Sequence, residues 1–399
     1  MHGSDTTTKR LICIVLDGVG IGELPDARLY GDEGSHTLRS TALAGGGLRL
    51  PHLEALGLGN IDPIPGIPPR QSPRASHGKM AERSRGKDST TGHWELAGLP
   101  VEKDFPTYPE GFPPEVIASF LRATGAKGFL GNTTASGTAI IQDLGAEHVR
   151  TGYPIVYTSA DSVFQIAAHE GVTPVGELYE ICRRTREEVC VGRHAVGRVI
   201  ARPFVGEPGS FRRTSNRKDF SLEPSGPTVL DLLSRHSIPV CGVGKIDDLF
   251  ALRGLSRSNH TRSNMEGVSA ILDLARELDH GLIIANLGDF DTLYGHRNDP
   301  AGLARALEAF DARFPEIEET LRAGEMFIVT ADHGNDPVTP STDHSREYVP
   351  LLVLVKGAEG GRDLGVRSSF ADVGKTIAEY FGVDNQLSGT SFLSQVLAP

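Results

Sequence analysis

The sequence contains few of the residues that characterise disulfide-stabilised proteins. Only four of its 399 residues are cysteine, none of them in a CxxC pair, and Cys13 and Cys241 lie inside apolar runs. Cysteines used in this way are typical of reduced, mostly buried thiols in a cytosolic enzyme. We therefore expect a cytoplasmic location and no disulfide framework.

Long apolar runs and an excess of positive charge are also missing. No apolar stretch approaches the roughly 20 residues that span a bilayer, and the N-terminal MHGSDTTTKR lacks the basic-then-apolar layout of a signal peptide. The formal net charge of −11 argues against general binding of nucleic acid or of a membrane surface. An anionic substrate would therefore need a local group of Arg and Lys side chains, or metal ions, to be held.

Short apolar runs that end in polar residues alternate with amphipathic segments. The expected strands are residues 11–17, 239–245, 282–291, 326–333 and 349–356. The expected helices are residues 228–235, 264–278, 300–322 and 370–381, and we expect Pro315 to kink or split the third of them. This alternation predicts an α/β fold with a mainly parallel sheet flanked by helices. Ligands bind such sheets outside the carboxyl ends of the strands.

The middle of the sequence has a different pattern. From about residue 105 to residue 220, Pro- and Gly-rich stretches separate two helical segments (114–123, 175–188) and three strand-like runs (155–159, 162–168, 196–205). We predict that residues 105–220 form an inserted α+β cap that binds substrate. Residues 1–104 and 221–399 would then form one discontinuous, metal-binding catalytic core.

Carboxylates and imidazoles stand at or just after the predicted core strands. The candidate metal ligands are Asp17, Asp291, His296, Asp332, His333 and His344. Three carboxylates that meet at one sheet edge would repel one another by about 4 kcal/mol per pair at ~4 Å and an effective dielectric of 20. Divalent cations remove that penalty, and mixed Asp/His ligation suits Mn²⁺ or Zn²⁺ better than Ca²⁺. The pattern indicates metal-assisted phosphate chemistry.

A run of hydroxyl residues precedes a helical segment at residues 86–96 (GKDSTTGHWEL). Ser and Thr in such a place are usually helix caps. A helix N-terminus also attracts phosphate, and coordination to a metal can make a hydroxyl there a nucleophile. Spacing alone does not choose among Ser89, Thr90 and Thr91, nor does it exclude that all three are caps.

Basic residues provide further candidate phosphate contacts. Arg198 and Arg202 lie on the same face of the strand predicted at residues 196–205, by the two-residue period of a strand. They would suit a phosphate as bidentate donors, but a solvated strand face explains them equally well. Lys245 ends a core strand and is either a phosphate partner or an ordinary surface lysine.

Taken together, these segments resemble phosphopentomutase, the manganese-dependent prokaryotic type within the alkaline phosphatase superfamily. The resemblance covers nearly the whole chain and includes residues 17–27 (DGVGIGELPDA), 87–95 (KDSTTGHWE), 157–170 (YTSADSVFQIAAHE), 289–300 (DFDTLYGHRNDP) and 330–337 (TADHGNDP). Asp-His-Gly alone would mark only the superfamily, whereas the cap motifs and KDSTTGHWE are specific to phosphopentomutases. The resemblance implies an alkaline-phosphatase-like core with an inserted cap.

The resemblance also implies two divalent cations, most often Mn²⁺, and a role for each candidate residue. Asp17, Asp332 and His333 look like the ligands of one cation, together with the nucleophile oxygen. Asp291, His296 and His344 look like the ligands of the other. Family positions that hold the pentose phosphate match Asp161, Arg198 and Lys245, with Ser159 and Ile200 nearby.

The family interconverts ribose 1-phosphate and ribose 5-phosphate, and the 2-deoxy sugars. It does so through a phosphorylated enzyme and a bisphosphate intermediate, and a sugar bisphosphate commonly primes it. The implied partners of this chain are therefore small pentose phosphates, with neither nucleic acid nor membrane. The oligomeric state stays open, with a monomer as one candidate.

One departure lies at the centre of the pattern. The family has threonine where this chain has Ser89, so an ungapped match gives Ser89 the nucleophile role and leaves Thr90 as the alternative. A serine can perform this chemistry, but a less hindered hydroxyl could favour hydrolysis. The alternatives are a phosphatase or phosphodiesterase of the same superfamily, a mutase for a modified pentose phosphate and, more remotely, a non-catalytic sugar-phosphate-binding protein.

Overall fold

The computed structural model describes residues 9–159 and 162–397, and the chain divides into two compact units. One unit combines Met1–Lys103 with Pro224–Pro399, and the other is Asp104–Glu223. We call them the core unit and the cap unit. The residues predicted to form the cap, 105–220, all fall within the cap unit, and its role in binding substrate stays a prediction.

An eight-stranded sheet organises the core unit. In spatial order its strands are β10 (Arg257–Asn259), β9 (Val240–Val243), β11 (Gly281–Leu287), β1 (Arg10–Leu16), β12 (Met326–Thr330), β13 (Val349–Val355), β2 (Ser76–Met80) and β14 (Asp363–Arg367). The first five strands run parallel, whereas β13 is antiparallel to both β12 and β2. The predicted α/β class with a mainly parallel sheet is confirmed.

The central strands are apolar because both of their faces are covered. All seven residues of β1 and all seven of β11 are buried. Strand β2 was not predicted, since its sequence SHGKM is mostly polar. Its burial comes from lying between β13 and β14, where Gly78 allows close approach to the backbone of Gly365.

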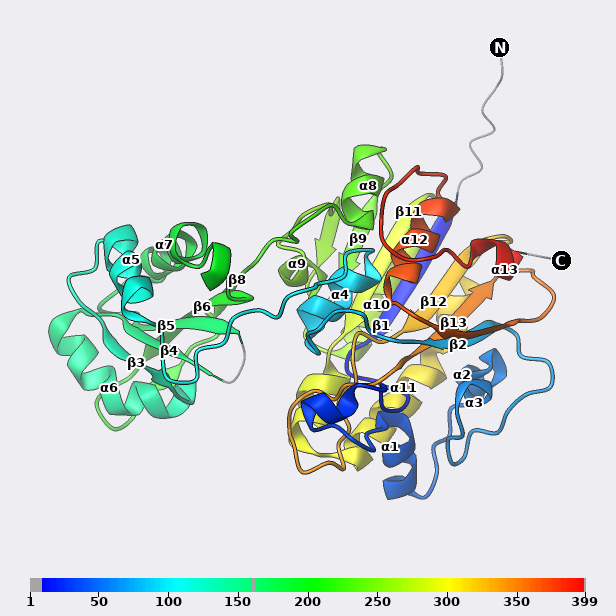
Figure 1. Cartoon of the computed structure of the whole chain (residues 1–399), viewed down its shortest axis with the longest axis horizontal. Helices are drawn as coiled ribbons and strands as arrows, with labels where there is room; N and C mark the ends of the chain where they lie inside the picture. The colour runs from blue at the N-terminus through cyan, green and yellow to red at the C-terminus, as the bar shows by residue number, and fades with distance from the viewer. Residues whose placement is uncertain (1–8, 160–161, 398–399) are drawn as a thin grey trace, which may run out of the picture. The chain divides into compact units, whose positions relative to one another are not determined.

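Helices cover both faces of this sheet (Figure 1). One group contains α1 (Thr37–Gly45), α2 (Pro51–Leu56), α10 (Asn264–Glu277) and α11 (Pro300–Glu319), and the other contains α4 (Ser89–Leu96), α8 (Val229–Arg235), α9 (Ile246–Leu249) and α12 (Ala371–Tyr380). The short helices α3 (Leu58–Ile61) and α13 (Leu393–Leu397) complete the unit.

Helix α11 corrects the expectation that Pro315 could split it, while the expected kink stays a prediction. The helix runs unbroken from Pro300 to Glu319 with Pro315 inside it. Proline removes one backbone hydrogen bond, but Phe314 and Ile317 on either side are fully buried in the core. Packing on both sides of the proline therefore keeps the helix in one piece.

The sheet register brings five chain segments to one edge. Strands β11, β1 and β12 are parallel neighbours, so their carboxyl ends lie side by side. Because β13 is antiparallel to β12, its first residue, Val349, lies at the same edge, and it pairs with Met80 at the end of β2. The residues that follow β2 and precede β13 are therefore placed beside those that follow β11, β1 and β12.

The cap unit has its own sheet, with strand order β3-β4-β5-β6-β7 and β8 paired with β6. The strands are β3 (Leu130–Thr134), β4 (Ile155–Thr158), β5 (Val163–His169), β6 (Arg198–Val205), β7 (Arg212–Arg213) and β8 (Lys218–Ser221). Helices α5 (Pro114–Thr124) and α7 (Val175–Arg184) pack with Phe164 and Ile166 on one face. Helix α6 (Gly137–Thr151), which was not predicted, packs with Tyr157 and Ala167 on the other.

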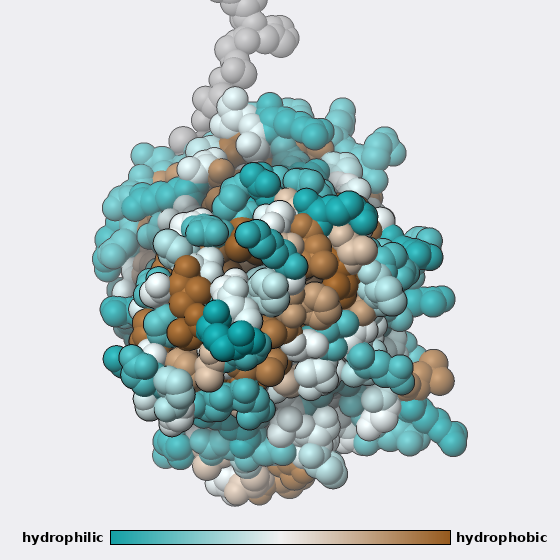
Figure 2. Space-filling view, turned by 90° about the vertical axis from the view of Figure 1, so that its left-hand side faces the viewer, coloured by the Kyte–Doolittle hydropathy of each residue, from teal (hydrophilic) through white to brown (hydrophobic). Residues whose placement is uncertain are grey.

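The surface drawn in Figure 2 is mostly hydrophilic, with apolar side chains in scattered patches, which is ordinary for a protein exposed to water. Among the described residues, no helix combines the length and the apolar character that crossing a membrane requires. All four cysteines are free and buried, as predicted.

A buried ion pair at the opposite edge of the core sheet gives a test of stability. Arg10 donates to the carbonyls of Ala275, Leu278 and Thr320 and lies 2.7 Å from the carboxylate of Glu325. Arg10→Ala would leave the buried Glu325 with only the half-exposed Arg322 as a cation partner, so we expect the free energy of unfolding of the core unit to fall by about 3 kcal/mol. Arg276→Ala, which breaks an exposed pair with Asp273, should cost less than about 1 kcal/mol. Urea unfolding of both variants checks this, and equal losses would contradict it.

Candidate active site

Three buried carboxylates meet at the edge where β11, β1 and β12 end. Asp17 directly follows β1, Asp332 follows β12 by two residues, and Asp291 lies on a single π-helical turn, Phe290–Tyr294, after β11. Their exposed fractions are 0%, 0% and 2%. Three carboxylates out of contact with water require positive charge nearby.

Asp17, Asp332 and His333 form one cluster of ligand atoms that could hold a metal ion. The Nε2 atom of His333 lies 3.4 Å from Asp17 Oδ1 and 3.4 Å from Asp332 Oδ2. The backbone N–H of Gly18 donates to Asp332 Oδ1, which holds the chain after β1 against the chain after β12. The cluster is therefore fixed by the backbone of two neighbouring strands.

Asp291 is the centre of a second cluster. His296 Nε2 lies 3.2 Å from one oxygen of Asp291, and His344 Nε2 lies 3.4 Å from the other. His333 also belongs to this group, since ligand atoms of Asp291, His333 and His344 lie close enough together to share an ion. The rings of His333 and His344 lie 3.9 Å apart, so the two clusters adjoin.

The charges of these groups stabilise one another. Burial opposes ionisation of Asp332, but the neighbouring His333 and His93 lower its pKa to about 2. Burial likewise opposes ionisation of Asp291, and His344 and His296 hold its pKa well below the ordinary value. The opposite shift occurs at His333, where burial is outweighed by Asp332 and Asp17 and the pKa is raised well above 6.5. The edge thus strongly favours positive charge.

The donor set fits divalent cations. Asp332 Oδ2 and His344 Nε2 are buried and, among the described residues, make no well-formed hydrogen bond, although His93 lies 3.1 Å from the former and Asp291 lies 3.4 Å from the latter. A buried carboxylate oxygen and a buried imidazole nitrogen of this kind, beside further Asp and His ligands, suit a Mn²⁺ or Zn²⁺ ion. Two such ions would also neutralise the three carboxylates.

Ser89 is the hydroxyl residue that the fold brings to this edge. It is the first residue of α4, and its Oγ lies 3.2 Å from His333 Nε2 and 3.5 Å from Asp17 Oδ1. Thr91 is occupied elsewhere, because its side chain and that of Asp88 form a capping box at the start of α4. Thr90 is almost fully buried. The geometry therefore favours Ser89 over the other two as the reactive hydroxyl.

The predicted substrate contacts fall in both units. Lys245, in the core unit, follows β9 by two residues and places Nζ 3.6 Å from Asp17 Oδ2. The cap unit contains the other described contacts, Ser159, Arg198 and Ile200. Arg198 is the first residue of β6, and its guanidinium lies 3.6 Å from the Asp219 carboxylate. Ile200 is buried. Asp161 lies outside the described residues.

Known proteins resemble this chain over nearly its whole length. The model of the Metalloenzyme superfamily matches residues 252–385, which include every predicted metal ligand except Asp17. A phosphopentomutase of Dictyoglomus turgidum is 59% identical over 388 residues, covering 97% of this chain and 98% of that protein. Phosphopentomutases of Acetivibrio thermocellus and of Anaeromyxobacter dehalogenans strain 2CP-C are 57% and 56% identical, each over 98% of this chain and 100% and 99% of the relative.

The chain belongs to the phosphopentomutase family. The predicted family and enzyme class, an isomerase, are thereby confirmed. The solved structures that resemble this chain share much less of its sequence. The PH0037 protein of Pyrococcus horikoshii has 15% identity and a TM-score of 0.49, covering 96% of this chain and 100% of that one. A Leishmania mexicana phosphoglycerate mutase has 12% identity and the same TM-score, over 97% and 98%. The family assignment depends on neither.

Three residues of this phosphopentomutase site were not predicted from the sequence. His93 lies one helical turn after Ser89 and places Nδ1 3.1 Å from Asp332 Oδ2. Asn286 donates to Asp17, and Asn335 donates to Asp291. Each of the three contacts a predicted metal ligand rather than the reacting groups. The four-residue spacing of Ser89 and His93 on one helix was the only available signal, because such residues share a helix face.

Gly92 gives a test of the close approach of α4 to the site. A Cβ at this position would overlap the backbone carbonyl of Asp332, whereas a Cβ at Gly45 of α1 would meet nothing within 4 Å. We expect Gly92→Ala to move Ser89 away from Asp17 and to lower kcat by about 100-fold, the scale expected for a misplacement of about 1 Å. Gly45→Ala should keep kcat and gain about 0.4–1 kcal/mol of stability. Steady-state kinetics and urea unfolding of both variants check this. Full activity of Gly92→Ala would contradict the packing described.

Proposed function

We propose that this member of the phosphopentomutase family interconverts ribose 1-phosphate and ribose 5-phosphate, and the corresponding 2-deoxyribose phosphates, with Ser89 as the nucleophile. The observation that carries the proposal is the position of Ser89 Oγ, 3.2 Å from His333 and 3.5 Å from Asp17 at the start of α4. A hydroxyl at a helix N-terminus beside a buried Asp/His cluster is suited to accept and release a phosphoryl group.

Six side chains of the core unit would hold two divalent cations, which we propose to be Mn²⁺. Asp17, Asp332 and His333 would hold one together with Ser89 Oγ. Asp291, His296 and His344 would hold the other. The bound cations supply charge neutralisation for the transferring phosphoryl group. In this role His93, Asn286 and Asn335 orient the ligands that they contact.

In the reaction that we propose, the phosphoryl group passes between Ser89 and the sugar and is not released as inorganic phosphate. Phosphorylated Ser89 gives its phosphoryl group to the free hydroxyl of the bound sugar monophosphate, so the serine O–P bond breaks as a sugar O–P bond forms. The product is a sugar bisphosphate, and the proton of the sugar hydroxyl balances the hydroxyl regained by Ser89. Ser89 then takes the other phosphoryl group and releases the isomeric monophosphate. A sugar bisphosphate would prime an enzyme molecule that starts without phosphate.

Basic residues of each unit suit the phosphate that is not being transferred. Lys245 holds positive charge close to Asp17, and Arg198 presents a guanidinium that is 39% exposed on the cap strand β6. We propose Lys245 as the phosphate contact that the core unit provides. We propose Arg198 as the phosphate contact of the cap unit, and Ser159, Asp161 and Ile200 as its sugar contacts.

Substitution of the hydroxyl residues tests the nucleophile. After incubation with a sugar bisphosphate, the intact mass of the native chain should rise by one phosphoryl group. Ser89→Ala should lose both this adduct and mutase activity, while Ser89→Thr and Thr90→Ala should keep both. Loss of the adduct in Thr90→Ala alone would move the nucleophile to Thr90. Release of inorganic phosphate from ribose 5-phosphate, without formation of ribose 1-phosphate, would identify a phosphatase instead.

Removal of the metal tests the ligand assignment. A chelator should abolish mutase activity and lower the melting temperature of the core unit, because Asp17, Asp291 and Asp332 then repel one another without cations. Mn²⁺ should restore both, and metal analysis should find two ions per chain in the native protein but fewer in Asp291→Asn. His260→Ala, which alters an exposed Asp/His group elsewhere in the core unit, should keep both ions. Two ions retained in Asp291→Asn would contradict the assignment.

A further inference from the structure

The segment that leads to Ser89 has no regular secondary structure of its own. Strand β2 ends at Met80 and α4 begins at Ser89, and neither helix nor strand is formed between them. Glu82 and Ser84 of this segment are nonetheless buried. Buried backbone groups need hydrogen-bond partners, so something other than a helix or a sheet must hold residues 82–86 in place.

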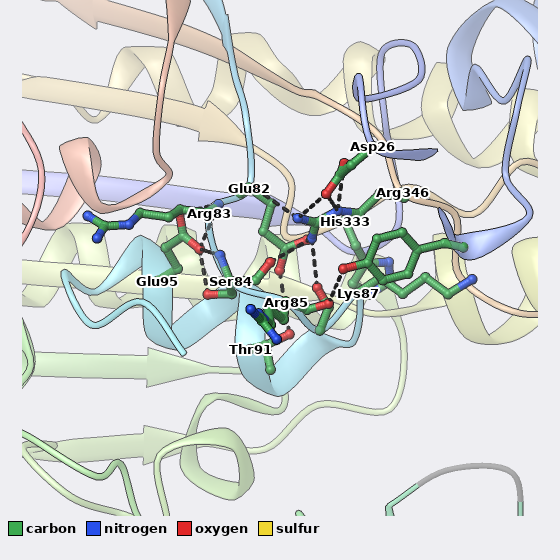
Figure 3. Close-up of polar contacts among 12 residues, drawn as sticks. Asp26, Glu82, Arg83, Ser84, Arg85, Lys87, Thr91, Glu95, His333 and Arg346 are labelled. Carbon is green, nitrogen blue, oxygen red and sulfur yellow. Dashed lines mark hydrogen bonds and ion pairs between the residues drawn. The ribbon is translucent and has the colours of Figure 1, made fainter. Parts of the chain in front are cut away.

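Arg346 provides the partners of three carbonyl groups of the segment (Figure 3). Its guanidinium donates to the carbonyl oxygens of Glu82, Ser84 and Gly86, at 3.1, 2.7 and 2.9 Å. The same group donates to the Glu82 carboxylate at 2.8 Å and to the carboxylate of Asp26. One buried side chain thus binds three alternate carbonyls of the segment.

Two other side chains hold further groups of the segment, and the backbone N–H of Arg85 donates to the carbonyl of Val101. The carboxylate of Glu95, on α4 itself, accepts the backbone N–H groups of Arg83 and Ser84. The hydroxyl of Tyr30 donates to the carbonyl of Arg85, and its ring lies over the Arg346 guanidinium. The conformation of residues 82–86 is therefore set by side chains from other parts of the chain.

Arg346 is itself anchored to the metal-ligand segments. It follows the predicted ligand His344 by two residues, and the residue between them, Ser345, pairs with Gly334 beside His333. Its backbone N–H donates to Asp32, which also binds Lys87, two residues before Ser89. Arg346 therefore connects the segment that presents the hydroxyl to the segments that present His333 and His344.

From this geometry we infer that Arg346 is a positioning residue for phosphoryl transfer, which sets the location of Ser89 Oγ relative to the metal ligands. The inference rests on the function proposed above. Arginine suits the task because its planar guanidinium carries five N–H donors in a fixed fork, whereas lysine carries three on a single rotating nitrogen. Lysine at this position would keep the charge opposite Glu82 but could not reach all three carbonyls.

The test compares Arg346→Lys with a matched variant, Arg10→Lys. Arg10 is the other buried arginine of the core unit that binds several backbone carbonyls and a glutamate, but it lies at the opposite edge of the sheet. We expect Arg346→Lys to lower kcat by about 10- to 100-fold, because a displacement of Ser89 by about 1 Å is sufficient for such a loss. KM and the content of two Mn²⁺ ions should stay native, since the substrate and metal ligands are untouched. Arg10→Lys should keep native kcat.

Hydrogen–deuterium exchange gives a second measurement that does not need activity. The peptide that covers residues 82–88 should exchange faster in Arg346→Lys than in the native chain or in Arg10→Lys. Tyr30→Phe, which removes one hydrogen bond to the segment and leaves the ring in place, should show a smaller increase if Arg346→Lys fails to fold. Native exchange of this peptide in the variants, or native kcat in folded Arg346→Lys, would overturn the inference. If the native chain proves to lack mutase activity, the proposed function fails, and exchange alone decides whether Arg346 holds the segment.

Discussion

The rest of the structure depends on an electrostatic constraint. Asp17, Asp291 and Asp332 lie together in a region that water does not reach, so their negative charges must be stabilised by the groups around them. Each carboxylate alone would be expelled to the surface, and three together repel one another. The surrounding imidazoles offset the burial of Asp332 and Asp291, whose pKa values are lowered, and the pKa of His333 is raised in return. Divalent cations would supply still more concentrated positive charge at this end of the sheet.

Much of this could be predicted from the sequence because the relevant signals are local. Apolar runs of strand length predict β1, β11 and β12. The polar residue that ends each run is predicted to lie at the carboxyl end of its strand. The alternation with helices then implies parallel strands, and parallel strands bring their carboxyl ends together. Asp17, Asp291 and Asp332 could thus be placed side by side although hundreds of residues separate the first from the others.

The features that could not be predicted depend on contacts between residues that are far apart in the sequence. Strand β2 is polar, so its burial follows only from its neighbours β13 and β14. The hydrogen-bond partners of residues 82–86 include Tyr30, Glu95, Val101 and Arg346, and no spacing in the sequence relates them. Nothing in the sequence distinguishes Arg346 from the other arginines, although its side chain is almost fully buried. Helix α11 shows the converse, since a clear local signal at Pro315 is overridden by the packing of Phe314 and Ile317.

The resemblance seen in the sequence implies a threonine at the position that Ser89 occupies. Serine lacks the β-methyl group that restricts rotation about χ1, so its hydroxyl samples more orientations than that of threonine. The backbone that carries it has little such freedom here. Asp88 caps α4, Gly92 brings the helix against Asp332, and Arg346 fixes the preceding segment. The freedom added by serine is therefore confined to one side-chain torsion, and a cation or His333 that engages Oγ would restrict that torsion as well. A site held this rigidly would accept serine in place of the threonine that the resemblance implies, because the backbone sets the position of the hydroxyl and only its orientation is left to the side chain.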